Sequence, residues 1–370
     1  MTRTLLRPTA FVDSPFGHDG KVARLAGGMT WFSAVELLAI DGHRRTSAEL
    51  VPIEGIQDRF DDGMAAQWEA LTASRPPFQV GERTIRLDQP QVMGIVNATP
   101  DSFSDGGQFP DGVAAAEAGA AMAADGAAII DVGGESTRPG ARSIWEGDEI
   151  ERVAPVIRQL AAGGTAVSCD TRKADVMTAA VEAGARMIND VSALTYDARS
   201  AGVAASLNVP VVLMHHKGAP EVMQDDPRYD DVLVEIYLWL EERIEAAVDA
   251  GVARNKILID PGFGFGKNVG HNLELMNGLA LFHSLGCPLV IGASRKRTIG
   301  ALSNEAPTDK RIGGSIALAV KAVEQGAQIL RVHDVFETVQ ALRVWRGLRD
   351  QALTPRVQAA VSIPSSPSLR

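Results

Sequence analysis

Polar side chains crowd into the residues that follow a short apolar run at residues 91–96. Over nine residues they provide an amide, three hydroxyls and two carboxylates: Asn97, Thr99, Asp101, Ser102, Ser104 and Asp105. Pro100 disfavours a helix there, and Gly106 and Gly107 provide the backbone freedom that a tight loop requires. An apolar strand ending in such a loop is typical of an α/β scaffold that presents a site, although a solvated turn has a similar composition.

Residues that could do chemistry also follow seven later apolar runs. They are Asp131 with residues 135–138, Asp170, Asn189 with Asp190, His215 with His216, Asp260, residues 294–296, and Arg331 with His333. A single charged residue at such a position is as often a cap of the next helix as a functional group. Capping alone does not explain such residues after all eight runs, so together they predict a site built at strand ends.

An acidic and amide subset of these residues consists of Asp170, Asn189 and Asp260. Carboxylates and amides can pair in a bidentate way with the edge of a flat heterocycle that carries several N–H groups. For Asp170, which precedes a predicted helix, capping is the alternative. Asp260 begins the segment 260–267, whose repeated glycines allow the backbone to approach a ligand closely.

A cationic subset consists of Arg138, Lys296, Arg331 and His333. Side chains alternate along a strand, so Arg331 and His333 are expected on the same side. Such a group suits a phosphate or diphosphate. The alternative is that these cations pair with nearby acids, but in a chain of net charge −10 several co-located cations favour binding of an anion.

The sequence contains no clear arrangement for a nucleophile. Cys169 and Cys287 stand outside activating motifs and are expected to be small buried residues. His215 and His216 are adjacent, so only one of them can face a site, where a hydrogen-bonded role is favoured over metal binding. A hard cation such as Mg²⁺ would take oxygen ligands from Asn97 and from the phosphates of a substrate.

The elements that must position these residues alternate regularly. Strands are predicted at residues 92–96, 128–132, 166–169, 187–191, 210–214, 257–259, 288–291 and 328–332. Helices are predicted at residues 113–124, 149–161, 173–183, 197–207, 232–250, 272–285, 310–325 and 335–348. Eight such pairs over about 260 residues indicate a (β/α)8 TIM barrel. An open doubly wound sheet is the competitor, but its glycine-rich phosphate loop after the first strand is missing.

Residues outside this repeat divide into two further parts. Residues 1–77 form an N-terminal extension of unknown role, in which residues 28–40 and 64–73 suggest a small accessory subdomain. Residues 78–350 form the predicted barrel, preceded by a hairpin at residues 78–87 that could close its floor. Residues 351–370, rich in proline and serine, are predicted to be a flexible tail.

Composition limits the kind of protein. Hydrophobic residues make up 45% of the 370 residues, so a large core can form, and the negative charge argues against a nucleic-acid or membrane-surface partner. Two distant cysteines favour a reducing compartment. We found no apolar segment of membrane-spanning or signal-peptide length, so we expect a cytoplasmic chain whose partners are small molecules.

Several motifs resemble those of the dihydropteroate synthase family of pterin-binding TIM barrels. Residues 97–107 and 131–141 resemble its two signature segments, and residues 260–267, 294–296 and 331–334 match further motifs in order. The resemblance covers residues 78–350. It implies a transferase of folate biosynthesis that joins 6-hydroxymethyl-7,8-dihydropterin diphosphate to para-aminobenzoate, with Mg²⁺, in an SN1-like displacement. It also implies a homodimer.

The resemblance assigns roles to residues of this sequence. It implies that the pterin is held by Asp170, Asn189, Asp260 and Lys296, with Met214 lining the pocket and Arg331 stacking on the ring. Diphosphate contacts would come from Asn97, Arg138, Arg331 and His333, and Asn97 would also reach Mg²⁺. The residues flanking para-aminobenzoate would be Thr137, Phe265 and Ser294. Asp105 would belong to a mobile first loop, and the residues closest to the chemistry would be Asp105, Asp260, Lys296 and Arg331.

Two departures and two alternatives remain. The family commonly reads Met-His-Met-Arg/Gln-Gly where residues 214–218 read Met-His-His-Lys-Gly, and most of the first ninety residues have no counterpart in its short form. A methyltetrahydrofolate–corrinoid methyltransferase shares a pterin-binding barrel but has no diphosphate to hold, so the cationic subset argues against it. A non-catalytic pterin-binding barrel would not require that subset or Asn97 and Asp105.

Overall fold

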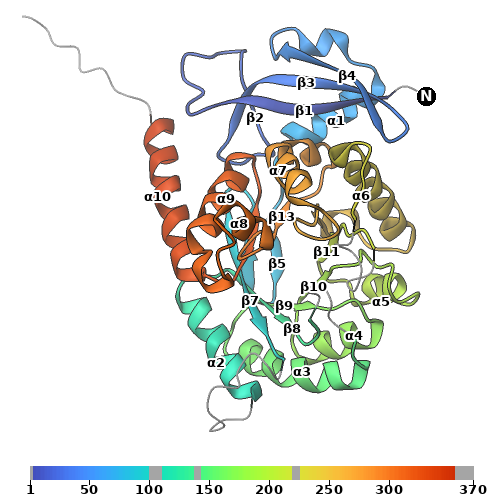
Figure 1. Ribbon diagram of the computed structural model, residues 1–370, viewed down its shortest axis with the longest axis vertical. Helices are drawn as coiled ribbons and strands as arrows, with labels where there is room; N and C mark the ends of the chain where they lie inside the picture. The colour runs from blue at the N-terminus through green and yellow to red at the C-terminus, as the bar shows by residue number, and fades with distance from the viewer. Residues whose placement is uncertain (1–2, 100–110, 137–142, 219–225, 355–370) are drawn as a thin grey trace, which may run out of the picture.

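Eight parallel strands form a closed barrel at the centre of this computed structural model, which describes residues 3–99, 111–136, 143–218 and 226–354 (Figure 1). The strands are β7 (Gln91–Asn97), β8 (Ile129–Gly133), β9 (Val167–Asp170), β10 (Met187–Asp190), β11 (Val211–Met214), β12 (Ile257–Asp260), β13 (Val290–Ile291) and β14 (Ile329–Val332). Neighbours follow chain order from β7 to β12, and β14 lies between β13 and β7. A parallel bridge between Ile259 and Leu289 closes the ring, which confirms the predicted TIM barrel.

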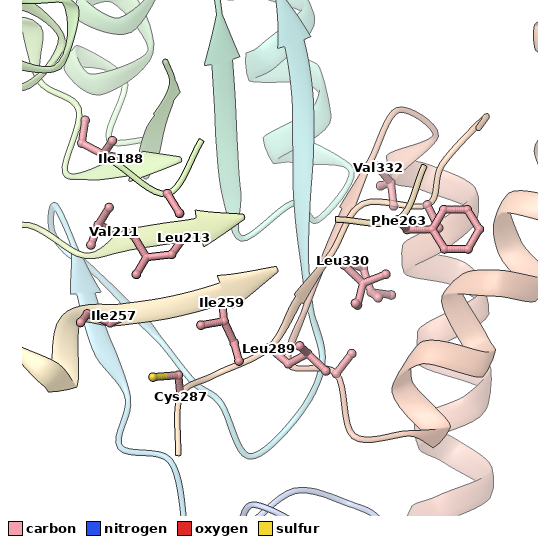
Figure 2. Packing of buried hydrophobic residues seen from close by; sticks show 14 of the residues in the cluster. Ile188, Val211, Leu213, Ile257, Ile259, Phe263, Cys287, Leu289, Leu330 and Val332 are labelled. Atoms are coloured by element: carbon pink, nitrogen blue, oxygen red, sulfur yellow. The ribbon is translucent and has the colours of Figure 1, made fainter. Parts of the chain in front are cut away.

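Side chains of the barrel strands alternate between the interior and the surrounding helices. Figure 2 shows outward-facing residues such as Val211, Leu213 and Ile259, which belong to the core between strands and helices. The inward residues near the amino ends form one apolar layer: Met93, Ile129, Ala166, Met187, Val212, Leu258, Val290 and Ile329. Two residues further along each strand, the inward positions include Asp131, Asn189, Asp260 and Arg331, so the interior becomes polar toward the carboxyl ends.

Helices follow the strands as predicted, with two differences. The barrel helices are α2 (Asp111–Ala124), α3 (Glu146–Ala162), α4 (Ala174–Ala183), α5 (Ser200–Leu207), α6 (Val232–Asp249), α7 (Val269–Asn277), α8 (Arg297–Leu302), α9 (Ile312–Glu324) and α10 (Val335–Leu353). The prediction of a single helix at residues 272–285 was wrong, because Gly278 ends α7 and a 3-10 helix, η4 (Leu279–Leu285), follows. A Cβ atom at Gly278 would lie 2.5 Å from Leu233 Cδ1. The short helix α8 was not predicted.

A two-stranded hairpin lies under the amino ends of the barrel strands. It consists of β5 (Phe78–Val80) and β6 (Arg83–Ile85), at the position where the sequence suggested a hairpin. Val80, Ile85 and Leu87 are buried in the same apolar cluster as the lowest inward layer of the barrel. Their burial closes this end, so access to the interior lies at the carboxyl ends of the strands.

Residues 3–52 contain a second sheet (Figure 1, blue), with strands β1 (Arg3–Val12), β2 (Ala23–Arg24), β3 (Trp31–Asp41) and β4 (Arg44–Pro52). A 3-10 turn, η1 (Ile56–Arg59), and helix α1 (Asp62–Thr72) follow. Leu5, Leu38 and Ile40 belong to the core shared with the barrel helices, whereas Leu6 and Leu37 pack in the cluster that contains α1. The sequence had indicated only the segments around β3 and α1, so the strands β1, β2 and β4 were not predicted.

The helix α10 continues to Leu353, so the first residues of the predicted tail are helical and residues 355–370 lie outside the described residues. None of the helices within the described ranges is long and apolar enough to cross a membrane.

Replacing Leu38 by alanine tests whether the N-terminal sheet is integral to the core. Leu38 is fully buried, so we expect Leu38→Ala to lower the free energy of unfolding by about 2–4 kcal/mol, measured by urea denaturation. Leu50→Ala is the matched control, because Leu50 on β4 is 64% exposed and its loss leaves no cavity. Equal midpoints for the two variants would show that the sheet does not share the core.

Candidate active site

Arg331 joins three strands in the interior of the barrel. Its Nε donates to Asp131 Oδ2 at 2.6 Å, and its Nη2 donates to Asp170 Oδ2 at 2.6 Å. Asn189 Nδ2 donates to the same Asp131 oxygen at 2.9 Å. Burial alone would lower the pKa of Arg331, but the two carboxylates raise it above its ordinary value, so the guanidinium stays charged. Arg331, from the cationic subset, thus pairs with Asp170, from the acidic subset, and with Asp131.

Asp131 is a central residue to which the sequence gave no role. It is fully buried, and its Oδ1 atom has no hydrogen-bond partner among the described residues. Strand alternation could have identified Asp131 as an inward residue, because it lies two residues after the inward Ile129 on β8. Burial also raises the pKa of Asp170, with the positive charge of Arg331 acting in the opposite direction. These two carboxylates hold Arg331 in place.

Asp260 lies at the end of β12 and is 5% exposed. Its Oδ1 accepts a hydrogen bond from the Gly262 backbone N–H at 2.7 Å. Burial raises the pKa of Asp260 to about 6, and that hydrogen bond together with the charge of Lys296 opposes the rise. A Cβ atom on Gly292 would lie 3.9 Å from both Asp260 Oδ2 and Arg331 Cβ. Asp260 and Arg331 therefore border the same space, which the glycine leaves open.

Glycines bring the loop after β12 against the loop after β11. Gly262 has φ +71°, and a Cβ atom there would lie 1.8 Å from the His215 carbonyl oxygen. Gly266 has φ +63°, and its Cβ would lie 2.3 Å from the Lys217 carbonyl oxygen. Both the left-handed backbone and the close approach require glycine. The glycine spacing noted in the sequence therefore serves backbone-to-backbone packing.

Lys267 fixes this loop from inside. Its ammonium group is buried and donates to the carbonyl oxygens of Gly262, at 2.9 Å, and Phe265, at 3.1 Å. His215 Nδ1 lies 3.0 Å from the same ammonium, which confirms the hydrogen-bonded histidine expected there. Burial lowers the pKa of Lys267 to about 7 and that of His215 well below its usual value. The sequence marked Lys267 only as the end of a motif.

Two further contacts connect residues after β12, β13 and β14. Lys296 Nζ lies 4.0 Å from the centre of the Phe265 ring, within the range of a cation–π contact. Ser294 Oγ lies 3.1 Å from His333 Nδ1 and accepts from its backbone N–H at 3.2 Å. Burial, then the charge of Arg331, lowers the pKa of His333 to about 3. His333 is therefore neutral near pH 7 and differs from the cation that the sequence suggested.

The remaining predicted residues lie at strand ends or beyond the described ranges. Asn97 ends β7 opposite Gly133, and Met214 ends β11 beside Asp260. The structure does not describe the predicted Asp105, Thr137 and Arg138. Within the described ranges, no group of three or more His, Cys, Asp or Glu side chains could hold a metal ion.

Comparison with known proteins gives the class to which this barrel and its strand-end site belong. The sequence model of the family described as pterin binding enzyme matches residues 93–333, about two thirds of the chain. The described site residues from Asn97 to His333 lie within this match, whereas β1 to β4 lie outside it.

Named relatives narrow the class. Dihydropteroate synthase of Escherichia coli (strain K12) is 47% identical over 262 residues, which cover 70% of this chain and 92% of the relative. The dihydropteroate synthase of Neisseria meningitidis serogroup B is 44% identical over 280 residues, which cover 74% of this chain and 98% of the relative. A solved structure of Xanthomonas albilineans dihydropteroate synthase with 4-aminobenzoic acid has a TM-score of 0.71 at 47% identity and covers 76% of this chain and all of its own. The chain belongs to the dihydropteroate synthase family.

The raised pKa of Asp260 predicts acid-sensitive pterin binding. Because its carboxylate charge is lost as the pH falls through about 6, we expect the affinity for 6-hydroxymethylpterin to fall about tenfold per pH unit below that value. This ligand carries no phosphate, so the phosphate groups of the substrate do not contribute to the titration. Isothermal titration calorimetry between pH 5 and 8 measures the effect. A constant affinity across this range would contradict the role of Asp260.

Proposed function

We propose that this chain joins 6-hydroxymethyl-7,8-dihydropterin diphosphate to para-aminobenzoate and releases 7,8-dihydropteroate and diphosphate. The supporting observation is the placement of buried Asp260 beside Arg331, which itself contacts Asp131 and Asp170. One space thus has hydrogen-bond acceptors for a pterin and a cation for its leaving group. A solved structure of Xanthomonas albilineans dihydropteroate synthase in complex with 7,8-dihydropteroate supports the proposal, with a TM-score of 0.68 at 44% identity.

The acidic residues would bind and orient the pterin. A carboxylate at Asp260 would accept hydrogen bonds from the amino and ring N–H groups of the heterocycle. Asp170 and Asn189 lie side by side on β9 and β10 and would provide further polar contacts. Met214 would pack against the ring, and Lys296 would donate to it. Since the interior is closed by the hairpin β5–β6, the pterin would enter from the carboxyl ends of the strands.

The reaction would proceed with departure of the leaving group first. The bond between the pterin methylene carbon and the diphosphate oxygen breaks, and the electron pair leaves with diphosphate. The amine nitrogen of para-aminobenzoate then forms a bond to the methylene carbon and loses a proton. No enzyme nucleophile is needed. The chain would contribute by orienting the two substrates and by stabilising the departing negative charge with Arg331 and Lys296.

Further contacts complete this assignment. Asn97, Arg138 and His333 would bind diphosphate, with neutral His333 contributing a hydrogen bond rather than a charge. Thr137, Phe265 and Ser294 would flank para-aminobenzoate, and Asp105 would lie in the loop over the reacting atoms. Of these residues, Phe265 already contacts Lys296, which supports adjacent binding of the two substrates.

The proposed Mg²⁺ would be held largely by the substrate. Asn97 offers one amide oxygen at the carboxyl end of β7, and no acidic cluster among the described residues competes for the ion. This sparse donor set fits a hard cation that takes most of its oxygen ligands from diphosphate. When bound, Mg²⁺ would neutralise part of the leaving-group charge.

The two alternatives, a methyltetrahydrofolate–corrinoid methyltransferase and a non-catalytic barrel, find no support among the relatives of this chain named above, which are dihydropteroate synthases. Neither transfers a group from a pterin diphosphate. Lys296 beside Phe265, and Arg331 beside Asp260, favour an anion-binding catalytic site over both.

A diphosphate-release assay tests the proposed reaction. We expect release by the wild-type chain to require the pterin diphosphate and Mg²⁺, and product to require para-aminobenzoate. Asp260→Asn and Lys296→Ala should lower kcat/KM by at least about 100-fold, since each removes a charge from the binding site. Asp249→Asn, at the exposed end of α6, is the matched control. Wild-type activity in either site variant would exclude the assignment.

We also propose that the chain is a cytoplasmic homodimer. Both cysteines are free and buried, which fits a reducing compartment. Along α10, Phe336, Val344 and Leu348 are 57%, 61% and 68% exposed and recur at multiples of four residues. Such spacing places them on one face, which is suited to contact with a second copy.

Light scattering after size-exclusion chromatography tests the dimer. We expect twice the chain mass of 39.2 kDa for the wild type and a shift toward one chain for Leu348→Glu, because the charge would be buried at the contact. Leu50→Glu changes an equally exposed leucine on β4 and should leave the mass unchanged. A wild-type mass of one chain would rule out this dimer.

A further inference from the structure

We infer that the N-terminal sheet positions the substrate-binding loops, and that Arg45 on β4 makes the connection by joining the start of α6 to the middle of α7. This inference rests on the proposed function, because it concerns how the loops of that site are held. It gives a role to a part of the chain that lies outside the match to the family. Arg45 would be a positioning residue that does not itself contact substrate.

Arg45 contacts two acids on different barrel helices. Its Nε and Nη2 both lie 2.9 Å from Asp231 Oδ2, and Nη2 lies 3.6 Å from Glu274 Oε1. The Arg45 side chain is 26% exposed and that of Asp231 is 10% exposed, so this pair is better shielded from water than most surface pairs. The other Asp231 oxygen accepts from Leu233 N and Val234 N, each at 3.1 Å, and so caps α6.

From the start of α6, contacts continue to the loops after β11 and β12. Tyr229, two residues before Asp231, donates its hydroxyl to the Gly266 carbonyl at 2.9 Å. Lys217 Nζ lies 4.1 Å from the centre of the Tyr229 ring and 3.0 Å from Glu235 Oε2 on α6. Gly266 in turn packs against the Lys217 backbone. Tyr229 and Glu235, which flank Asp231, therefore hold the loops after β11 and β12 together.

From Glu274, contacts continue along α7 to the loop after β12 and to α8. Asn272, two residues earlier, accepts from the Gly264 N–H at 2.7 Å and donates to Thr298 Oγ1 at 3.1 Å. Gly264 precedes Phe265, and Thr298 lies in α8, whose N-terminal cap is Lys296. One side chain of the N-terminal sheet thus joins the two helices that support the Phe265–Lys296 contact.

The sheet is itself fixed, so it can act as a support. Arg3 on β1 makes two hydrogen bonds of 2.6 Å to Glu241 on α6. Arg75, after α1, donates to the His283 carbonyl at 2.9 Å, and Arg349 on α10 donates to the Met29 carbonyl at 2.9 Å. Arg3 pairs with Ile40, which also pairs with Arg45, so the Arg3–Glu241 contact keeps this end of the sheet attached when Arg45 is lost. Arg75 and Arg349 hold the sheet at other points, so loss of Arg45 would free the loops without releasing the sheet.

Arg45→Ala and the matched variant Arg59→Ala test this inference. Arg59 pairs with Glu49 within the N-terminal part, and both side chains are well exposed. We expect Arg45→Ala to raise KM for the pterin diphosphate about three- to fivefold with kcat within about twofold, the size that one partly shielded ion pair supports. Arg45→Lys should restore part of the loss, and Arg59→Ala should change neither constant.

Amide hydrogen exchange gives a readout independent of catalysis. Arg45→Ala should speed exchange at residues 262–267, while exchange in β1 and β3 stays at the wild-type rate. Unchanged exchange in the loop, or an equal KM change in Arg59→Ala, would overturn the positioning role. If the wild-type chain did not turn over the pterin diphosphate, the proposed function would fail, and the exchange result would still decide whether Arg45 holds the loops.

Discussion

The charged pairing of Arg331 with Asp131 and Asp170 is the constraint on which the rest of the site depends. A guanidinium and two carboxylates in the barrel interior are tolerable only if each charge has a close partner, because water is largely excluded there. The pairing requires β14, β8 and β9 to lie at their observed positions. It therefore couples closure of the barrel to the presence of a cation beside Asp260, where a diphosphate could be bound.

Strand alternation explains how one barrel provides both a stable core and a polar site. The lowest inward layer is apolar and is sealed by the hairpin β5–β6, whereas the next inward positions carry Asp131, Asn189, Asp260 and Arg331. At the polar end of the barrel, Gly262 and Gly266 let the backbones of the loops after β11 and β12 pack directly against each other. Lys267 then donates to two carbonyl oxygens within the loop after β12, those of Gly262 and Phe265. Along these strands, the residues near the amino end thus stabilise the core, and those near the carboxyl end form the binding site.

The sequence predicted the barrel well because its strands are short apolar runs and its helices fill the intervals between them. It predicted less where local pattern is weak. Most residues of β4 are exposed, so this strand lacks an apolar run and is held by pairing with β3. Gly278 ends α7, and a side chain there would collide with Leu233, a neighbour 45 residues earlier that no helical periodicity reveals. Asp131 was noticed at a strand end but was given no role.

The sequence by itself determined which residue types stand at the strand ends, and through its motifs the family to which the chain belongs. Only the tertiary structure decided which of those residues meet. Arg331 pairs with acids 200 and 161 residues earlier, and Arg45 pairs with an acid 186 residues later. Such contacts depend on closure of the ring and on packing of the N-terminal sheet, both of which bring together distant segments whose local sequences carry no record of one another.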